Sequence, residues 1–272
     1  MPPEHLRLVE ARHGRFLVPR QDIYVGRSLE VYGEWCETEI RIAAQVIKPG
    51  DVIVDAGANI GTHSVAFARM AGPKGRVYAI EAQPGMAQIV GANALLNGLS
   101  NIVPLNVGLA DAPGSFAIGP INYGANANFG GISIPDLDGH EDAAGRIRVS
   151  LMPLDELVDL PRLSFFKLDI EHMEAQALRG ARQTIARCLP VIYLENSDPV
   201  ETSAILAELQ TFGYRAFWHE CRLFAPDNWR GNAENIFENV SCVNMLCVPE
   251  GRAVQGLTPA TGPETHPRRR GR

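Results

Sequence analysis

The sequence has little cysteine, no long apolar segment and no large excess of charge of either sign. Its five cysteines are odd in number and form no CxxC pair. This spacing argues against a disulfide framework and against a zinc site, and it favours a reducing, cytoplasmic location. No segment approaches the roughly 20 apolar residues of a membrane span, and the first residues lack a signal-peptide core. The net charge of −6 gives no reason to expect binding to nucleic acid or to a membrane surface.

The chain does have an ordinary globular composition and a regular alternation of strand and helix patterns. Of its 272 residues, 46% are apolar and 21% are charged. Strands are predicted over 52–56, 76–82, 102–110, 163–171, 190–196, 214–219 and 241–248. Helices are predicted around 40–47, 60–71, 84–96, 173–185 and 201–212. This alternation predicts a mostly parallel α/β sheet covered on both faces. Because no helical pattern separates the last two strands, we expect at least one of them to run antiparallel.

These patterns divide the chain into three parts. Residues 1–48 contain an apolar–polar alternation, "RFLVPRQDIYVGRSLEVYGEW", which predicts an N-terminal β flap followed by a lead-in helix. Residues 49–250 form the α/β domain, interrupted at 111–150 by an insertion with a Gly/Asn-rich loop, "NYGANANFGG". Residues 251–272 are rich in Pro, Gly and Thr and end in "RRRGR", so we expect a disordered basic tail.

The stretch "VIVDAGANIGTHSVAFA" places the carboxylate of Asp55 directly before a Gly57–Gly61 turn. Ligands of open α/β sheets bind at the carboxyl ends of strands. A dinucleotide loop would read GxGxxG, but one glycine is missing here, and a carboxylate about 4 Å from a phosphate is disfavoured by roughly 4 kcal/mol. S-adenosylmethionine has no phosphate and carries positive charge, and Glu81 is placed to accept from its ribose hydroxyls. The loop favours this methyl donor, with an NAD-dependent oxidoreductase as a remote alternative.

Several stretches together resemble the FkbM-type family of S-adenosylmethionine-dependent methyltransferases over about residues 20–248. They are "GDVIVDAGANIGTHSVAFA", "GRVYAIEAQP", "NALLNGLSNIVPLNVGLAD", "NFGGISI" and "FFKLDIEHMEAQALRGA". The resemblance implies a class I methyltransferase (Rossmann-like) three-layer sandwich, with a seven-stranded, mostly parallel sheet and an antiparallel last strand. It implies cofactor binding by Asp55, Gly57, Asn59, Gly61, Glu81 and Asn106. In one departure, His172 stands where family members usually have Gly.

Methyl transfer to a hydroxyl needs alignment and a base that removes the acceptor proton. Our catalytic candidates are Asp169, Glu171, His172 and Glu195, which follow two strands that end at the cofactor. Carboxylates gathered in one cleft should raise at least one pKa. Asp169 could instead cap the next helix. Asp169, Glu195 and Asn196 could also supply oxygen ligands for a divalent metal.

The predicted reaction is therefore O-methylation of a small-molecule or carbohydrate hydroxyl. Transfer to the nitrogen of an amine or guanidine is the alternative, because an acidic cluster would also bind a cationic acceptor. A cofactor-binding protein without catalysis is a third reading. Residues that could line the acceptor pocket are Asn126, Asn128, Phe129, Trp218 and His219. The sequence indicates neither the identity of the acceptor nor the oligomeric state.

Overall fold

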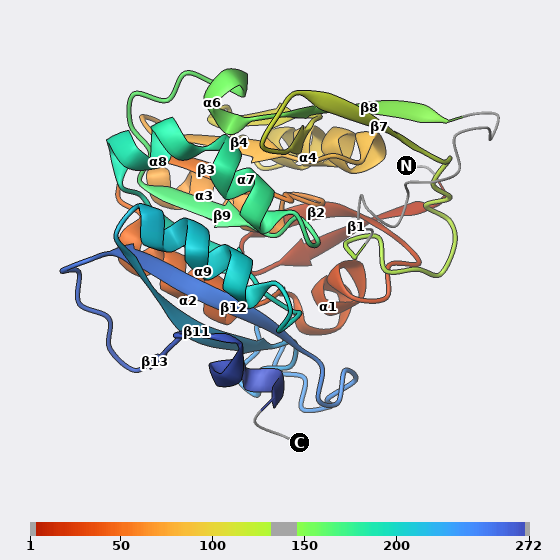
Figure 1. Cartoon of the computed structure of the whole chain (residues 1–272). Helices are drawn as coiled ribbons and strands as arrows, with labels where there is room; N and C mark the ends of the chain where they lie inside the picture. The colour runs from red at the N-terminus through yellow and green to blue at the C-terminus, as the bar shows by residue number, and fades with distance from the viewer. Residues whose placement is uncertain (1–3, 132–145, 270–272) are drawn as a thin grey trace.

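The computed structural model describes residues 4–131 and 146–269, and its centre is one large sheet (Figure 1). The eight strands lie in the order β13-β11-β12-β10-β9-β3-β4-β5. They are β3 (Val52–Ala56), β4 (Arg76–Ile80), β5 (Ile102–Leu105), β9 (Phe165–Leu168), β10 (Val191–Glu195), β11 (Tyr214–Arg222), β12 (Ser241–Pro249) and β13 (Thr258–Pro259). Strands β10, β9, β3, β4 and β5 are parallel, whereas β12 is antiparallel to both of its neighbours. The mostly parallel sheet with an antiparallel last strand is confirmed, but the edge strand β13 makes eight strands instead of seven.

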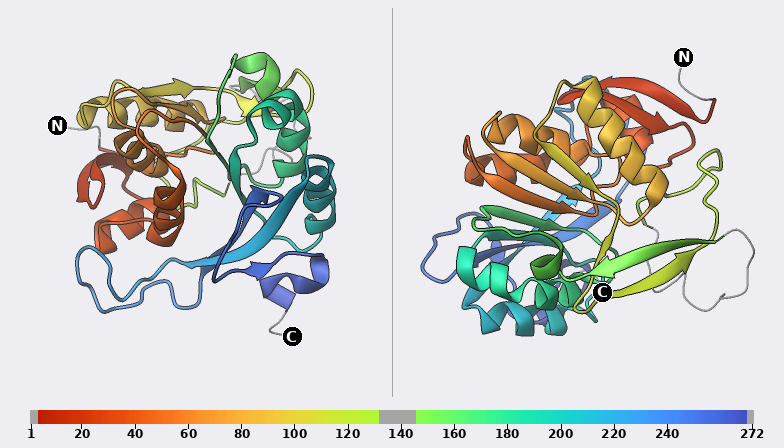
Figure 2. Two further views of the ribbon diagram at one scale, coloured as in Figure 1. Left: turned by 90° about the vertical axis from the view of Figure 1, so that its left-hand side faces the viewer. Right: turned by 90° about the horizontal axis from the view of Figure 1, so that it is seen from above.

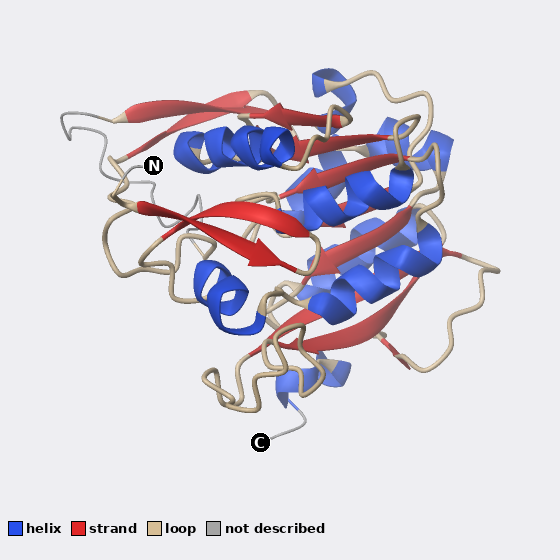
Figure 3. Cartoon of the chain, turned by 180° about the vertical axis from the view of Figure 1, so that it is seen from behind, coloured by secondary structure: helices blue, strands red, loops and turns tan. Residues whose placement is uncertain are grey.

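Helices cover both faces of this sheet. They are α1 (Val25–Tyr32), α2 (Glu37–Val46), α3 (Thr62–Ala71), α4 (Pro84–Leu96), α6 (Leu154–Leu157), α7 (Glu174–Gly180), α8 (Arg182–Cys188) and α9 (Thr202–Thr211). Helices α7, α8 and α9 lie on the face seen in Figure 1, and α2, α3 and α4 lie on the face seen in Figure 3. Successive strand residues such as Ile53 and Val54 enter different apolar cores, because side chains alternate across a strand. None of the described helices is long and apolar enough to cross a bilayer.

The N-terminal flap is a hairpin of β1 (Leu6–Ala11) and β2 (Gly14–Pro19). The expectation that the strand pattern continues to about residue 35 is wrong, because Val25–Tyr32 forms helix α1. Its buried residues Val25, Ser28, Leu29 and Tyr32 follow the i, i+3, i+4, i+7 spacing of one helix face. The apolar–polar alternation suggested a strand over a segment whose buried residues in fact follow the spacing of a helix.

The insertion contributes a small second sheet with the order β6-β8-β7. It is built from β6 (Gly108–Leu109), β7 (Gly114–Ile118) and β8 (Ile147–Met152), while residues 132–145 of the expected insertion lie outside the described residues. The β7–β8 pair and the N-terminal hairpin extend toward the same side of the molecule, at the right of Figure 1 and of the right-hand view in Figure 2. The predicted strand over 102–110 is thus divided between the two sheets.

The C-terminal segment is ordered against the large sheet as far as Arg269, which corrects the expectation of a disordered tail for these residues. After β13, residues Pro263–Thr265 and Pro267–Arg269 form short 3₁₀ helices. His266 is fully buried, and its Nε2 donates to the carbonyl oxygen of Asn196 at 2.9 Å. The indole of Trp218 donates to Thr265 Oγ1 at 2.9 Å. Residues 270–272 lie outside the described residues.

Replacing Asn93 with leucine is expected to lower the free energy of unfolding by about 2–4 kcal/mol. This fully buried amide accepts from Leu17 N–H at 2.7 Å and donates to the carbonyl of Ile60 at 2.7 Å, so it joins α4 to the hairpin and to the loop after β3. Asn97→Leu is the matched control: its bonds to Arg15 are exposed, so water can replace them. Urea denaturation measures both variants, and equal losses would contradict the role of burial.

Candidate active site

The loop between β3 and α3 passes directly over the end of β9. Gly57 has φ +78°, and a Cβ atom there would lie 1.7 Å from the carbonyl oxygen of Asp169. Only glycine combines this φ with such a close approach. The N–H groups of Gly57 and Ala58 both donate to the carbonyl of Ile80, at 2.9 and 3.0 Å. The loop is therefore held between the ends of β4 and β9.

Glu81 follows β4 and is fixed to this loop by both carboxylate oxygens. Oε2 accepts from the N–H of Asn59 at 2.7 Å, and Oε1 accepts from the N–H of Gln83 at 2.8 Å. Burial raises the pKa of Glu81 to about 7, although these two N–H groups lower it. Each oxygen keeps capacity for a further hydrogen bond. Glu81 can therefore still accept from hydroxyl groups of a ligand.

A pocket of about 360 Å³ opens at the carboxyl ends of β3, β4, β9 and β10. Small-molecule sites typically enclose ~300–1,000 Å³. Gly57, Asn59, Glu81 and Gln83 line it, as do residues 107–109. Asn59 Oδ1 and Gln83 Oε1 are buried and have no hydrogen-bond partner in the described structure. Unpartnered buried oxygens are unfavourable, so a ligand with donor groups would complete this lining.

The carboxylates of Asp169, Glu171 and Glu195 converge in the same pocket. Each offers an oxygen within 4.8 Å of the other two. Burial raises the pKa of Glu195 well above its ordinary value, and the charges of Asp169 and Glu171 raise it further, whereas the hydroxyl of Ser197, which donates to it at 2.7 Å, lowers it. Asp169 forms an ion pair with Lys167 at 2.8 Å. Three of the four catalytic candidates are thus brought together beside the glycine loop.

This strand–loop–strand region coincides with a known family domain. Residues 55–216, more than half of the chain, match the methyltransferase FkbM domain. The chain belongs to the FkbM methyltransferase family. It is therefore an S-adenosylmethionine-dependent methyltransferase, and the alternative of an NAD-dependent oxidoreductase is wrong.

Solved structures with similar backbones include another FkbM protein. The methyltransferase FkbM from Methylobacillus flagellatus KT is 19% identical, with 76% of this chain and 50% of that chain covered and a TM-score of 0.43, so the match spans half the length of that protein. Precorrin-6y C5,15-methyltransferase from Geobacter metallireducens GS-15 is 15% identical, with 78% and 89% covered and a TM-score of 0.45. TYW2 from M. jannaschii in complex with AdoMet is 16% identical, with 92% and 88% covered and a TM-score of 0.46. A comparison with curated proteins finds no match.

The pocket of this FkbM methyltransferase fits S-adenosylmethionine on its own chemistry. The free acceptor capacity of Glu81 suits ribose hydroxyls, and the unpartnered oxygens of Asn59 and Gln83 suit further donors of the ligand. Thr62, the first residue of α3, also lines the pocket. A helix N-terminus attracts carboxylates, and the cofactor's methionine part carries one.

Three of the six cofactor candidates do not line the pocket and instead lie behind the residues that do. Asp55 is fully buried, accepts from the hydroxyl of Ser64, and lies opposite Lys167 across β3 and β9. Gly61 has φ +86° and is the N-cap residue directly before α3. Asn106 donates to the carbonyls of Glu81 and Ala82, each at 2.9 Å. Asp55, which we expected to face the ligand, thus does not line the pocket, whereas Asp169, Glu171 and Glu195 do.

His172 is separated from the other catalytic candidates. It has φ +76°, its side chain is 44% exposed, and its Nδ1 lies 2.9 Å from Oε1 of Glu201. Although partial burial lowers it, the pKa of His172 is raised by Glu201 and by neighbouring carboxylates. It lines a different depression, together with Arg268 of the C-terminal segment. A left-handed turn at the position usually held by Gly thus turns this imidazole away from the pocket.

Most of the acceptor-pocket candidates lie elsewhere as well. Asn128 lines the pocket, whereas Phe129 is buried and offers only its carbonyl to Gln83. Trp218 packs against His266 of the C-terminal segment, and His219 Nδ1 is hydrogen-bonded to the hydroxyl of Tyr193. Asn126 lines a neighbouring depression. Other residues that line the pocket come from distant segments of the chain, including Tyr24, Ser241 and Arg268.

Lys167 is the functional residue that the sequence reasoning missed. It is buried in β9, and its ammonium interacts with Asp169, Asp55 and Glu39. Although burial lowers its pKa, these three carboxylates raise it above the ordinary value. The signal in the sequence was a single charge within the apolar run "FFKLDI". A buried charge in a central strand needs partners of opposite charge. The pairing of β3 with β9 places Asp55 opposite Lys167.

Unfolding free energy is expected to fall as pH rises from about 5 to about 8. Burial raises the pKa of Glu39 and of Glu81 to about 7 and that of Glu174 to about 8. In this range the folded chain keeps protons that the unfolded chain has lost, so ionisation of the folded state opposes folding. Urea denaturation across this range measures the slope, which Glu174→Gln should make less steep. A stability that rises with pH would contradict this assignment.

Proposed function

We propose that this FkbM methyltransferase transfers the methyl group of S-adenosylmethionine to a hydroxyl oxygen of a small molecule or carbohydrate. The observation that carries the proposal is Glu195, a partly buried carboxyl of raised pKa inside the pocket and beside two further carboxylates. A base is most effective when its pKa lies near the working pH. Ordinary carboxylates have a pKa near 4, so burial makes Glu195 a much stronger base for a hydroxyl proton.

The roles follow from the arrangement around Glu195. The glycine loop and Glu81 bind and orient the methyl donor, whose sulfonium carbon is the electrophile. An acceptor hydroxyl held between the donor and Glu195 would give its proton to this carboxylate as the new C–O bond forms and the C–S bond of the donor breaks, which releases S-adenosylhomocysteine. Orientation of the two reactants can contribute about 7–11 kcal/mol. The base typically adds a further ~10²–10⁴-fold.

Transfer to nitrogen is the second candidate, and the convergence of three carboxylates favours it, because they would attract a cationic amine or guanidine. Two features reduce this attraction. Lys167 already pairs with Asp169 at 2.8 Å, and the raised pKa of Glu195 means that its surroundings disfavour the charged form. The cluster therefore carries less negative charge than three free carboxylates. For this reason we rank oxygen above nitrogen as the acceptor atom.

A small acceptor fits this chain better than a nucleic acid does. The net charge is −6, and the acceptor side of the pocket is formed by carboxylates, which repel a phosphate backbone. The pocket volume of about 360 Å³ matches a small ligand. Competition by polyanionic RNA for turnover of a small acceptor would argue against this assignment.

The proposal is tested in two steps. Isothermal titration with S-adenosylhomocysteine should give saturable heat, and absence of heat at high micromolar ligand would contradict the cofactor site. A panel of hydroxyl, amine and guanidine compounds is then incubated with radiolabelled methyl donor, and NMR of the labelled product identifies the methylated atom. Label on oxygen supports the proposal. Label exclusively on nitrogen would replace it with the second candidate.

Turnover is expected to persist in the presence of EDTA. The carboxylates of Asp169, Glu171 and Glu195 are oxygen donors of the type that Mg²⁺ prefers. However, Lys167 already supplies a cation to Asp169 at 2.8 Å. A buried ammonium beside the cluster disfavours a second cation. Loss of activity with EDTA and its recovery with Mg²⁺ would show that the metal alternative is right.

A further inference from the structure

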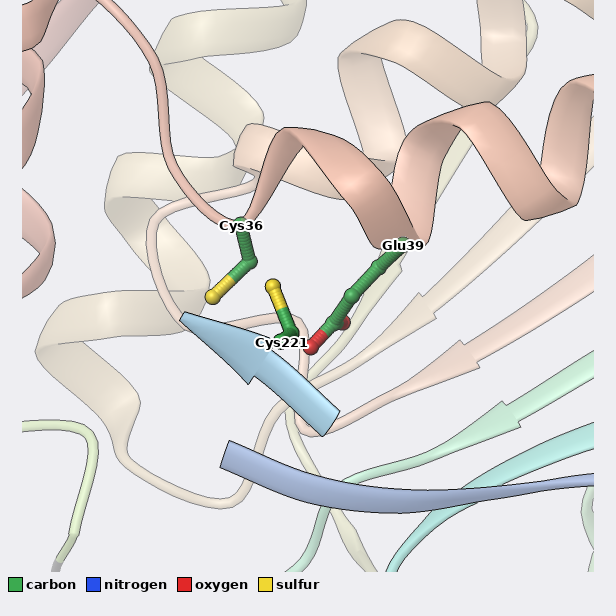
Figure 4. Close-up of side chains that lie close together, drawn as sticks. All are labelled: Cys36, Glu39 and Cys221. Carbon is green, nitrogen blue, oxygen red and sulfur yellow. The ribbon is translucent and has the colours of Figure 1, made fainter. Parts of the chain in front are cut away.

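A cluster of thiols and one carboxylate lies beside the active site, on residues with no role in the proposed methyl transfer. Cys36 Sγ, Cys221 Sγ and a carboxylate oxygen of Glu39 all lie within 4.8 Å of one another. Figure 4 shows the thiols of Cys36 and Cys221 turned toward each other, with the carboxylate of Glu39 beside Cys221. Cys36 directly precedes α2, Glu39 is in its first turn, and Cys221 lies near the end of β11.

The three side chains are closed off from solvent. Their residues are 3%, 6% and 0% exposed for Cys36, Glu39 and Cys221. The thiols pack among apolar residues that include Tyr32 and Phe237. Cys36 has φ +45°, a conformation that is uncommon for residues other than glycine. A carboxylate in such surroundings is costly unless a positive group compensates it.

Further donors surround this cluster. Cys242 lies directly opposite Cys221 in the β11–β12 pair, and its thiol interacts with that of Cys36. His63 Nε2 lies 3.4 Å from Glu39 and is buried without a hydrogen bond. The amide of Asn244 donates to Glu39 Oε1 at 3.1 Å and orients the carboxylate. Ligands of metal ions are typically held by such outer hydrogen bonds.

We infer that Cys36, Cys221 and Glu39 bind a zinc ion, with Cys242 as the fourth donor. Thiolate and carboxylate are common zinc ligands, and the usual geometry is tetrahedral. Zn–S bonds of about 2.3 Å place two sulfurs about 3.8 Å apart, so the thiols need to approach by at most about 1 Å. This is within reach of side-chain rotation. Magnesium and calcium are excluded as occupants because hard cations avoid thiolates.

The charge balance of this site is also favourable. Each thiol releases one proton when it binds the ion. Three thiolates and one carboxylate around Zn²⁺ leave a net negative charge, and the buried ammonium of Lys167, which already acts on Glu39, offsets part of it. Cys242 also lines the pocket, so the ion has a route of entry. Bound zinc would join α2 to β11 and β12 at the acceptor side of the pocket.

Metal binding by the full chain, purified without metal affinity and stripped with a chelator, tests this inference. Zinc is titrated against a chromophoric competitor, and Co²⁺ is added separately to detect sulfur-to-cobalt charge-transfer absorption. We expect one ion per chain. Removal of an outer-shell partner costs ~10–100-fold in affinity, so Cys36→Ser, Cys221→Ser and Glu39→Gln should each lose more than this. Cys242→Ser should weaken binding without abolishing it.

Cys188→Ser is the matched control, because this partly exposed thiol on α8 lies outside the cluster. It should bind zinc like the unmodified chain. Zinc should also raise the melting temperature of the unmodified chain and of Cys188→Ser, but not that of Cys36→Ser, which separates lost binding from misfolding. Absence of zinc binding, unchanged affinity in Cys36→Ser, or a disulfide found by mass spectrometry without reductant would overturn the inference. None of these measurements depends on methyl transfer.

Discussion

Gly57→Ala is expected to abolish binding of S-adenosylhomocysteine, with a loss of affinity of roughly 100-fold or more, which corresponds to about 2.7 kcal/mol. The new Cβ would lie 1.7 Å from a backbone carbonyl oxygen, that of Asp169, which cannot rotate away as a flexible side chain would. Either the loop or the end of β9 must move. Both elements line the pocket, so the donor site and the acidic cluster are displaced together.

Gly72→Ala separates this clash from the effect of backbone conformation. Gly72 also has positive φ, +63°, but a Cβ atom there would meet nothing within 4 Å. The control therefore experiences only the strain of a positive-φ backbone, about 1–3 kcal/mol, and it lies at the far end of α3 from the pocket. Isothermal titration measures affinity, and circular dichroism verifies folding. If Gly57→Ala bound S-adenosylhomocysteine within a few-fold of the original chain, the tight loop would not be essential.

Glu195→Gln is expected to lower kcat by about 10²–10⁴-fold with an unchanged affinity for S-adenosylhomocysteine. The amide keeps the shape of the side chain but cannot take a proton from the acceptor. In the unmodified enzyme the ionised form of Glu195 is the active one, so activity should fall as pH drops through its raised pKa. The variant should lack this acidic limb. The measurement is a pH profile of kcat with an acceptor from the compound panel.

Glu174→Gln is the matched control for this substitution. Glu174 is another buried glutamate with a raised pKa, about 8, but it accepts from the N–H of Ile170 and does not line the pocket. Its replacement should change stability and leave the pH profile of kcat intact. An increase in KM with kcat preserved in Glu195→Gln would indicate that the carboxylate binds a cationic acceptor. That result would favour N-methylation over O-methylation.

The sequence determined the family and the class of fold, and three of its six cofactor candidates line the pocket. These depend on signals that are local in the chain: the strand–glycine–helix succession around Gly57, the glutamate that ends the next strand, and the alternation of strands and helices. Such patterns reflect hydrophobic periodicity and backbone geometry over a few residues. For the same reason the apolar–polar alternation of the N-terminal flap did not reveal the helix α1 at Val25–Tyr32, which packs through residues spaced with the helical period.

Tertiary structure alone decided which charged side chains lie in the pocket and which residues lie next to it. Asp55 is buried because strand register sets it opposite Lys167, and His172 is turned away by a left-handed backbone. The spacing of the cysteines argued against zinc, yet Cys36 and Cys221 meet where α2 lies on the end of β11. Such contacts join residues far apart in the sequence, and they are fixed by packing and strand pairing, which no local pattern encodes.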